Sequence, residues 1–135
     1  MDTQLTPAEL QSNLGQFTGT EDYHRHWLGM YYTDGVQYLA EKAGAYWLID
    51  AIASYQPKVA VRQEEFQVWT LRCLDDLFSS RSAVLTMDNG NDGPTIITQA
   101  IEYTDFPFDE IRLYLVKGSI DGKHINNILM LTSEY

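Results

Sequence analysis

Residues 35–55 read GVQYLAEKAGAYWLIDAIASY, and their apolar pattern predicts the longest helix of the chain, against which the other elements would pack. Its apolar side chains recur at intervals of three and four, which is the spacing of one helix face. They are Val36, Leu39, Ala40, Ala43, Trp47 and Ala51. Asp34 can cap the first turn, with Gln37 three residues on as its partner. Pro57 disfavours the helical conformation at the residue before it, so we expect one helix of about 30 Å.

The second half of this helix, residues 45–53, is apolar on nearly every side. Such a helix is covered on more than one side. We expect a sheet on one side and the N-terminal helix or a partner chain on another. The N-terminal helix is predicted over residues 6–14, where Thr6 and Glu9 form a capping box around Pro7.

The rest of the chain is typical of strands. Segments rich in β-branched and aromatic residues follow one another at 66–73, 83–87, 95–103, 111–116 and 128–131. Turn sequences separate them, such as 88–94 and Asp121-Gly122, and short turns between successive strands indicate an antiparallel sheet. Alternation over residues 23–28 predicts one more strand, at an edge. We therefore expect a single α+β domain over residues 1–135, with one long helix packed on an antiparallel sheet of four to five strands and a short N-terminal helix.

The composition describes an acidic globular protein. Its 135 residues include nine Lys and Arg against nineteen Asp and Glu, a formal net charge of -10. This charge repels phosphate backbones, so we expect no direct nucleic-acid binding. The first residues lack a signal-peptide pattern, and the most apolar stretch, 43–53, is too short to cross a bilayer. We expect a cytoplasmic protein without membrane contact, in which Cys73, the only cysteine, is a buried core residue.

His24 and His26 form the sharpest candidate for chemistry. On a strand, side chains two residues apart point to the same face, so both imidazoles could reach one metal ion. The types available for a third ligand are His124, Asp34 and Asp50. The alternative is a polar face on an exposed strand. The zinc-protease spacing, the glycine-rich phosphate loops and the nucleophile elbow are all absent, so we assign no catalytic residue, no metal and no cofactor.

Asp50 lies among apolar neighbours in the predicted helix, which leaves two interpretations open. A buried carboxylate there could act as a general acid. Otherwise Asp50 occupies the solvated stripe of the helix or accepts a hydrogen bond from a buried Tyr or Trp. The turn sequence over 88–93 fails the EF-hand pattern, because Gly90 stands at its third position and Gln99 at its twelfth.

Acidic residues gather between positions 75 and 110, where Arg81 is the one basic residue. They are Asp75, Asp76, Asp88, Asp92, Glu102, Asp105, Asp109 and Glu110, and Phe106 and Phe108 lie beside them in sequence. One interpretation is a solvated surface that keeps the protein soluble. The other is a patch, with these two aromatic side chains as contact surface, that attracts a basic partner such as a nucleic-acid-binding protein.

Five blocks spread over most of the chain resemble a family of small bacterial proteins, the domain of unknown function 6876. The blocks are 32–36, 45–56, 65–69, 103–107 and 133–135, and the most specific reads AYWLIDAIASYQ. The resemblance implies no activity and no catalytic residue. It implies a context, because members occur on mobile elements such as plasmids and phages, whose small proteins are often accessory factors that bind host proteins, including defence proteins.

We therefore predict a non-catalytic acidic protein that binds or regulates a basic protein partner, such as a nucleic-acid-binding or defence protein of the host of a mobile element. The alternative is a small-ligand- or metal-dependent enzyme that uses His24, His26, Asp34 and Asp50. A third interpretation is a homo-oligomer that forms through the apolar half of the long helix.

Overall fold

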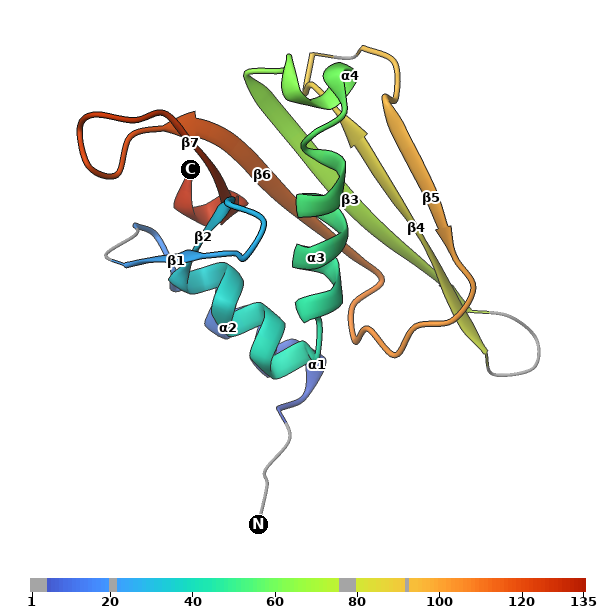
Figure 1. The fold of residues 1–135 in the computed structure, drawn as a ribbon. Helices are drawn as coiled ribbons and strands as arrows, with labels where there is room; N and C mark the ends of the chain where they lie inside the picture. Colours follow the sequence, from blue (N-terminus) through green and yellow to red (C-terminus); the bar gives the residue numbers. More distant parts are fainter. Residues whose placement is uncertain (1–4, 20–21, 76–79, 92) are drawn as a thin grey trace.

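A sheet of seven strands forms the centre of the computed structural model, which describes residues 5–19, 22–75, 80–91 and 93–135 (Figure 1). The strands lie in the order β1-β2-β7-β6-β3-β4-β5. Their bounds are β1 Tyr23–Arg25, β2 Tyr31–Thr33, β3 Phe66–Asp75, β4 Arg81–Asp88, β5 Ile97–Ile101, β6 Glu110–Gly118 and β7 Asn126–Leu131. The helices are α1 Pro7–Leu14, α2 Asp34–Ala43, α3 Tyr46–Tyr55, α4 Val59–Arg62 and the 3-10 turn η1 Thr132–Glu134. The α+β class is confirmed.

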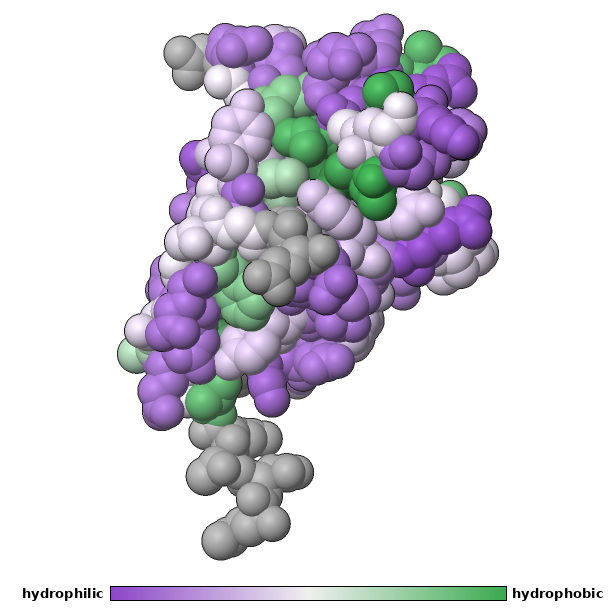
Figure 2. All heavy atoms as spheres, turned by 90° about the vertical axis from the view of Figure 1, so that its left-hand side faces the viewer, coloured by the Kyte–Doolittle hydropathy of each residue, from purple (hydrophilic) through white to green (hydrophobic). Residues whose placement is uncertain are grey.

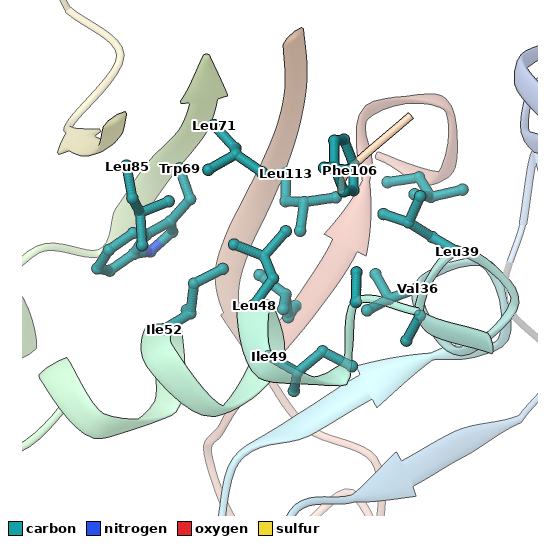
Figure 3. Packing of buried hydrophobic residues seen from close by; sticks show 14 of the residues in the cluster. Val36, Leu39, Leu48, Ile49, Ile52, Trp69, Leu71, Leu85, Phe106 and Leu113 are labelled. Atoms are coloured by element: carbon teal, nitrogen blue, oxygen red, sulfur yellow. The ribbon is translucent and has the colours of Figure 1, made fainter. Parts of the chain in front are cut away.

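The core lies between the helices and one face of the sheet. Leu48 and Ile52 of α3 point toward Trp69, Leu71 and Leu85 of the strands (Figure 3). Successive strand residues point to opposite faces, so the neighbours of Trp69 and Leu71 in β3 lie on the other face of the sheet. The covering of α3 comes from this chain itself, and Leu48 and Ile52 are at most 2% exposed.

The predicted long helix is wrong, because the chain forms two helices at this place. Gly44 between them has the left-handed backbone angles φ 62 and ψ 39, and its N–H donates to the carbonyl of Ala40. This is the usual way for a helix to end at glycine. The first helix is capped by Thr33 rather than by Asp34, since the Thr33 hydroxyl accepts the N–H of Val36 at 3.3 Å.

The sheet is larger than predicted, and it is mixed. The five predicted strands form the antiparallel part, β7-β6-β3-β4-β5. Two short strands extend it, since β2 runs parallel to β7, with Tyr31 opposite Ile128, and β1 pairs antiparallel with β2. The prediction of four to five antiparallel strands is therefore wrong for the whole sheet. The edge position of β1 is confirmed, although β1 ends at Arg25.

Two further predictions concern the burial of Cys73 and the length and apolarity of the helices. Cys73 is buried, 7% exposed, as predicted, and this burial raises the pKa of its thiol. In the part of the chain that the structure describes, no helix is both long enough and apolar enough to cross a membrane.

Candidate functional site

His24 and His26 bind different carboxylates. His24 Nε2 lies 2.8 Å from Asp34 Oδ1 at the start of α2, and His26 Nε2 lies 2.7 Å from Asp50 Oδ1 on α3. The strand ends at Arg25, so His26 belongs to the turn that follows. The alternation that would place both imidazoles on one strand face therefore stops before His26.

The second nitrogen of each imidazole also has a partner. The Leu28 N–H donates to His26 Nδ1 at 3.1 Å, and the Gln37 amide nitrogen lies 3.5 Å from His24 Nδ1. Because the backbone N–H of Leu28 can only donate, His26 Nδ1 is the acceptor in this contact, and Nε2 of the same ring faces Asp50. A metal ligand or a general base needs a free lone pair, and that of His26 Nδ1 is occupied by the Leu28 N–H. Among the described residues, no group of three or more His, Cys, Asp or Glu side chains could hold a metal ion.

Asp50 lies on the solvated side of α3. Its side chain is 61% exposed, whereas its partner His26 is 6% exposed. The interpretation of Asp50 as a buried general acid is therefore wrong, and the solvated stripe is confirmed. Its neighbours on the core side, such as Ile49, are buried instead.

The His26–Asp50 pair holds a turn. The His26 N–H donates to the Met30 carbonyl, and the Gly29 N–H donates to the His26 carbonyl at 2.8 Å. Gly29 has φ 99, which only glycine adopts easily. Trp27 at the tip is 81% exposed, with its ring stacked on His26 at 5.7 Å. These contacts make His26 part of the turn that joins β1 to β2.

The acidic window divides between the two ends of the sheet. Asp75 lies opposite Arg81, and Arg72 lies opposite Glu110, so these residues share one end of the sheet. The Thr104 N–H donates to the Arg81 carbonyl, which brings the segment around Thr104 to the same end. Most carboxylates of the acidic window therefore lie at this end. We define the acidic end as Asp75, Glu102, Asp105, Asp109 and Glu110, all of which are exposed. Asp88 lies at the far end of β4. Asp76 and Asp92 lie outside the described residues.

Two arginines partly neutralise the acidic end. Arg81 reaches Asp75 at 3.0 Å and Asp109 at 3.3 Å, while Arg72 reaches Glu110 at 2.8 Å. The side chains of Asp75 and Asp109 are nevertheless 67% and 92% exposed, so both remain accessible to a partner. The acidic end therefore stays negative on balance.

The two phenylalanines predicted as contact surface belong to the core. Phe106 is 1% exposed and Phe108 is 5% exposed, and their rings meet edge to face at 5.7 Å. The prediction that they contact a partner is wrong, because both rings turn inward from the loop around Pro107. The exposed apolar side chains near the acidic end are Leu74 at 55% and Tyr103 at 73%.

A hollow of about 440 Å³ lies on the face of the sheet opposite α3. We call it the sheet hollow, and its lining consists of Phe66, Val68, Asp88, Gly90, Gly93, Arg112 and Tyr114. Among these residues, only Asp88 was predicted from the sequence as a candidate site residue. The others come from β3, β6 and the loop after β4, and they meet only because of the strand register.

Another exposed surface is apolar and lies at the connection between β6 and β7. Ile120 is 38% exposed and Ile125 is 73% exposed. Hydrophobic side chains gather in the upper part of the face shown in Figure 2, level with this connection in Figure 1. This surface was not predicted from the sequence.

Comparisons with known proteins place the chain in a family. A search of curated proteins and a search of solved structures each found no match. A family model matches residues 8–135, nearly the whole chain, and includes all five blocks that suggested the resemblance. The chain therefore belongs to the family of unknown function DUF6876.

Proposed function

We propose that the protein is a non-catalytic binding protein whose acidic end recognises a basic protein partner. The observation that carries the proposal is the exposure of Tyr103 and Leu74, 73% and 55%, near exposed carboxylates. Tyrosine is enriched among interface anchors, and surrounding charge steers a partner of opposite sign. Phe106 and Phe108 give this end a firm base, since both are core residues.

The geometry of the histidines favours binding over catalysis. An enzyme built on His24, His26, Asp34 and Asp50 needs a group that can exchange a proton or bind a metal, and both imidazoles are bonded at both nitrogens. The apolar segment 45–53, which suggested a homo-oligomer, packs Leu48, Ile49 and Ile52 within the chain and leaves Tyr46 43% exposed.

The partner class follows from the charge of the acidic end. Nucleic-acid-binding proteins carry positive grooves that the acidic end would complement. We therefore propose that the partner is a nucleic-acid-binding or defence protein of a host cell. A bacterial and mobile-element origin of the chain stays a prediction.

The test is capture of partners from a lysate of the native host at low and high salt, with three forms of the protein. The first is the unaltered chain. The second carries Glu102→Gln and Asp105→Asn at the acidic end. The third carries Glu64→Gln and Glu65→Gln, which lie just before β3 at the opposite end of that strand from Asp75.

We expect the unaltered chain and the control variant to retain the same basic protein at low salt and to release it at high salt, because salt screens exposed charges. The acidic-end variant should retain less of it. Retention that is independent of salt, equal retention by all three forms, or recovery of no partner at any salt would each contradict the proposal.

A further inference from the structure

We infer that the sheet hollow binds a short zwitterionic peptide of about three residues, with its carboxylate on Arg112, its amino group on Asp88 and an apolar middle side chain on Phe66 and Tyr114. This site is independent of the proposed function, because its lining shares no residue with the acidic end. Its volume of about 440 Å³ falls within the range of small-ligand sites.

The floor of the sheet hollow is apolar and aromatic. Val68 lies between its strand neighbours Asp88 and Tyr114, and it is 6% exposed. The rings of Phe66 and Tyr114 lie 5.0 Å apart, and Tyr135 packs on both, at 5.3 Å and 5.4 Å. This cluster offers an aromatic surface of fixed geometry on which an apolar side chain can pack.

The loop after β4 forms a wall of the hollow. A Cβ atom on Gly90 would lie 3.2 Å from side-chain atoms of Phe66 and of Val68, so the Gly90 backbone lies directly against the floor. Asp88 Oδ1 accepts the Gly90 N–H at 2.8 Å, and Asn89 Oδ1 accepts the Asn91 N–H at 3.1 Å. These side-chain-to-backbone bonds fix the wall before any ligand binds.

The charges of the hollow indicate what kind of ligand it fits. Arg112 has no hydrogen-bond or ion-pair partner within the described ranges, whereas Arg72 on the same face is paired with Glu110. Asp88 lines the same hollow, and no ion pair joins it to Arg112 in the described chain. A ligand that carries both charges would satisfy Arg112 and Asp88 together, and an arginine binds a carboxylate through two parallel hydrogen bonds.

The separation of the Cα atoms of Asp88 and Arg112 limits the length of the ligand. Asp88 lies on β4 opposite Val68, and Arg112 lies on β6 opposite Thr70, so β3 runs between them. Two strand spacings and two residues along the strand put their Cα atoms roughly 12 Å apart. An extended peptide of three residues spans about 10 Å, and the two side chains cover the rest.

The experiment is a titration of ¹⁵N-labelled protein with the peptide Ala-Phe-Ala, followed by NMR. We expect chemical-shift changes at the amides of Gly90, Gly93 and Tyr114, with affinity near the roughly millimolar range. Arg112→Gln and Asp88→Asn should each weaken binding about tenfold, since each removes a charged hydrogen-bond partner. Arg72→Gln is the matched control, because it removes a paired arginine from the same face.

Peptides with blocked ends test the charges from the ligand side. N-acetyl-Ala-Phe-Ala should lose the Asp88 contact and Ala-Phe-Ala-amide the Arg112 contact, each with about tenfold weaker binding. Absence of shifts at the hollow would overturn the inference. So would blocked peptides that bind as tightly as Ala-Phe-Ala, or an Arg72→Gln variant that weakens binding as much as Arg112→Gln does. The spectrum of each variant shows whether it is folded, so a lost signal is not mistaken for lost binding.

Discussion

The side chain of a single residue, Glu134, connects the end of the chain to the start of α2. Its Oε1 accepts the Thr33 hydroxyl at 2.6 Å and the Leu131 N–H at 2.9 Å, and the residue is only 8% exposed. A Cβ atom on Gly35 would lie 2.6 Å from the same oxygen, so glycine is needed for this close approach. The carboxylate therefore links β2, α2 and β7.

We predict that Glu134→Ala lowers the free energy of unfolding by about 2 to 3 kcal/mol, because it leaves buried donors of Thr33 and Leu131 unpaired. Denaturant unfolding measures this change, with the exposed Glu102→Ala as control. A loss for Glu134→Ala no larger than that of the control would show that the buried donors find other partners.

Asp121 makes a second testable contact at this scale. A hydrogen bond from the His124 side chain at 2.8 Å, with the backbone N–H groups of His124 and Lys123, lowers the pKa of Asp121 from 3.8 to about 2. The ionised carboxylate thus favours the folded state above pH 3.8, and this contribution disappears as the pH falls through about 2.

We predict that His124→Ala raises the pKa of Asp121 toward 3.8, since it removes the largest cause of the shift. The remaining backbone hydrogen bonds should keep the value below 3.8. An NMR titration of the Asp121 carboxyl measures the pKa, and His24→Ala serves as a control that leaves the 121–124 turn intact. An unchanged pKa in His124→Ala would contradict the assigned cause.

At the scale of elements, Gly44 separates α2 from α3. Its φ of 62 is unfavourable for other residues, and no atom lies within 4 Å of the position of an added Cβ. We predict that Gly44→Ala lowers the free energy of unfolding by about 1 to 2 kcal/mol, through backbone strain alone. Gly44→Asn should cost less, because asparagine tolerates this conformation.

Gly19→Ala is the control for this prediction, since a Cβ there also meets nothing within 4 Å and Gly19 has no left-handed φ. Thermal or denaturant unfolding of the three variants gives the order. Equal stability of Gly44→Ala and Gly19→Ala would mean that the helix boundary can move without cost.

The same elements show what a sequence can and cannot predict. The apolar spacing over 35–55 correctly indicates helix, but one glycine inside a helix costs only about 1 kcal/mol, so local preference cannot decide between one helix and two. The packing of α2 against β2 and β7, and of α3 against the face with Trp69, decides it. The strand Tyr31–Thr33 is too short to show an alternating pattern, so β2 and its parallel pairing could not be predicted.

At the scale of the whole molecule, the sheet separates groups that are adjacent in sequence. The acidic window was predicted as one patch, but β4 is eight residues long, which places Asp88 about 23 Å from Arg81 and the acidic end. The reverse holds for the sheet hollow, where residues from β3, β4 and β6 meet. Strand register creates such a site from residues that lie far apart in the sequence.

The antiparallel part of the sheet should also be more stable than its β1–β2 edge. Within the described ranges, β1 pairs with β2 alone, over three residues, and β2 is joined to β7 by two residue pairs. β3 pairs along nearly its whole length with both β4 and β6. Local opening of the β1–β2 edge therefore breaks few hydrogen bonds, whereas exposure of β3 requires global unfolding.

We predict that amides of Tyr31–Thr33 exchange with solvent faster than those at the centre of β3, and hydrogen exchange followed by NMR measures both. Asp50→Ala removes the hydrogen-bond partner of His26. The native contact is lost both when the β1–β2 edge opens locally and when the protein unfolds globally. Its removal should therefore speed hydrogen exchange of Tyr31–Thr33 and of β3 about equally. Leu71→Val, a change of about 1 kcal/mol in the core, should speed exchange in β3 alone, because Leu71 stays packed when only the edge opens. Equal protection of both regions, or faster exchange of Tyr31–Thr33 in Leu71→Val, would show instead that the sheet unfolds as one unit.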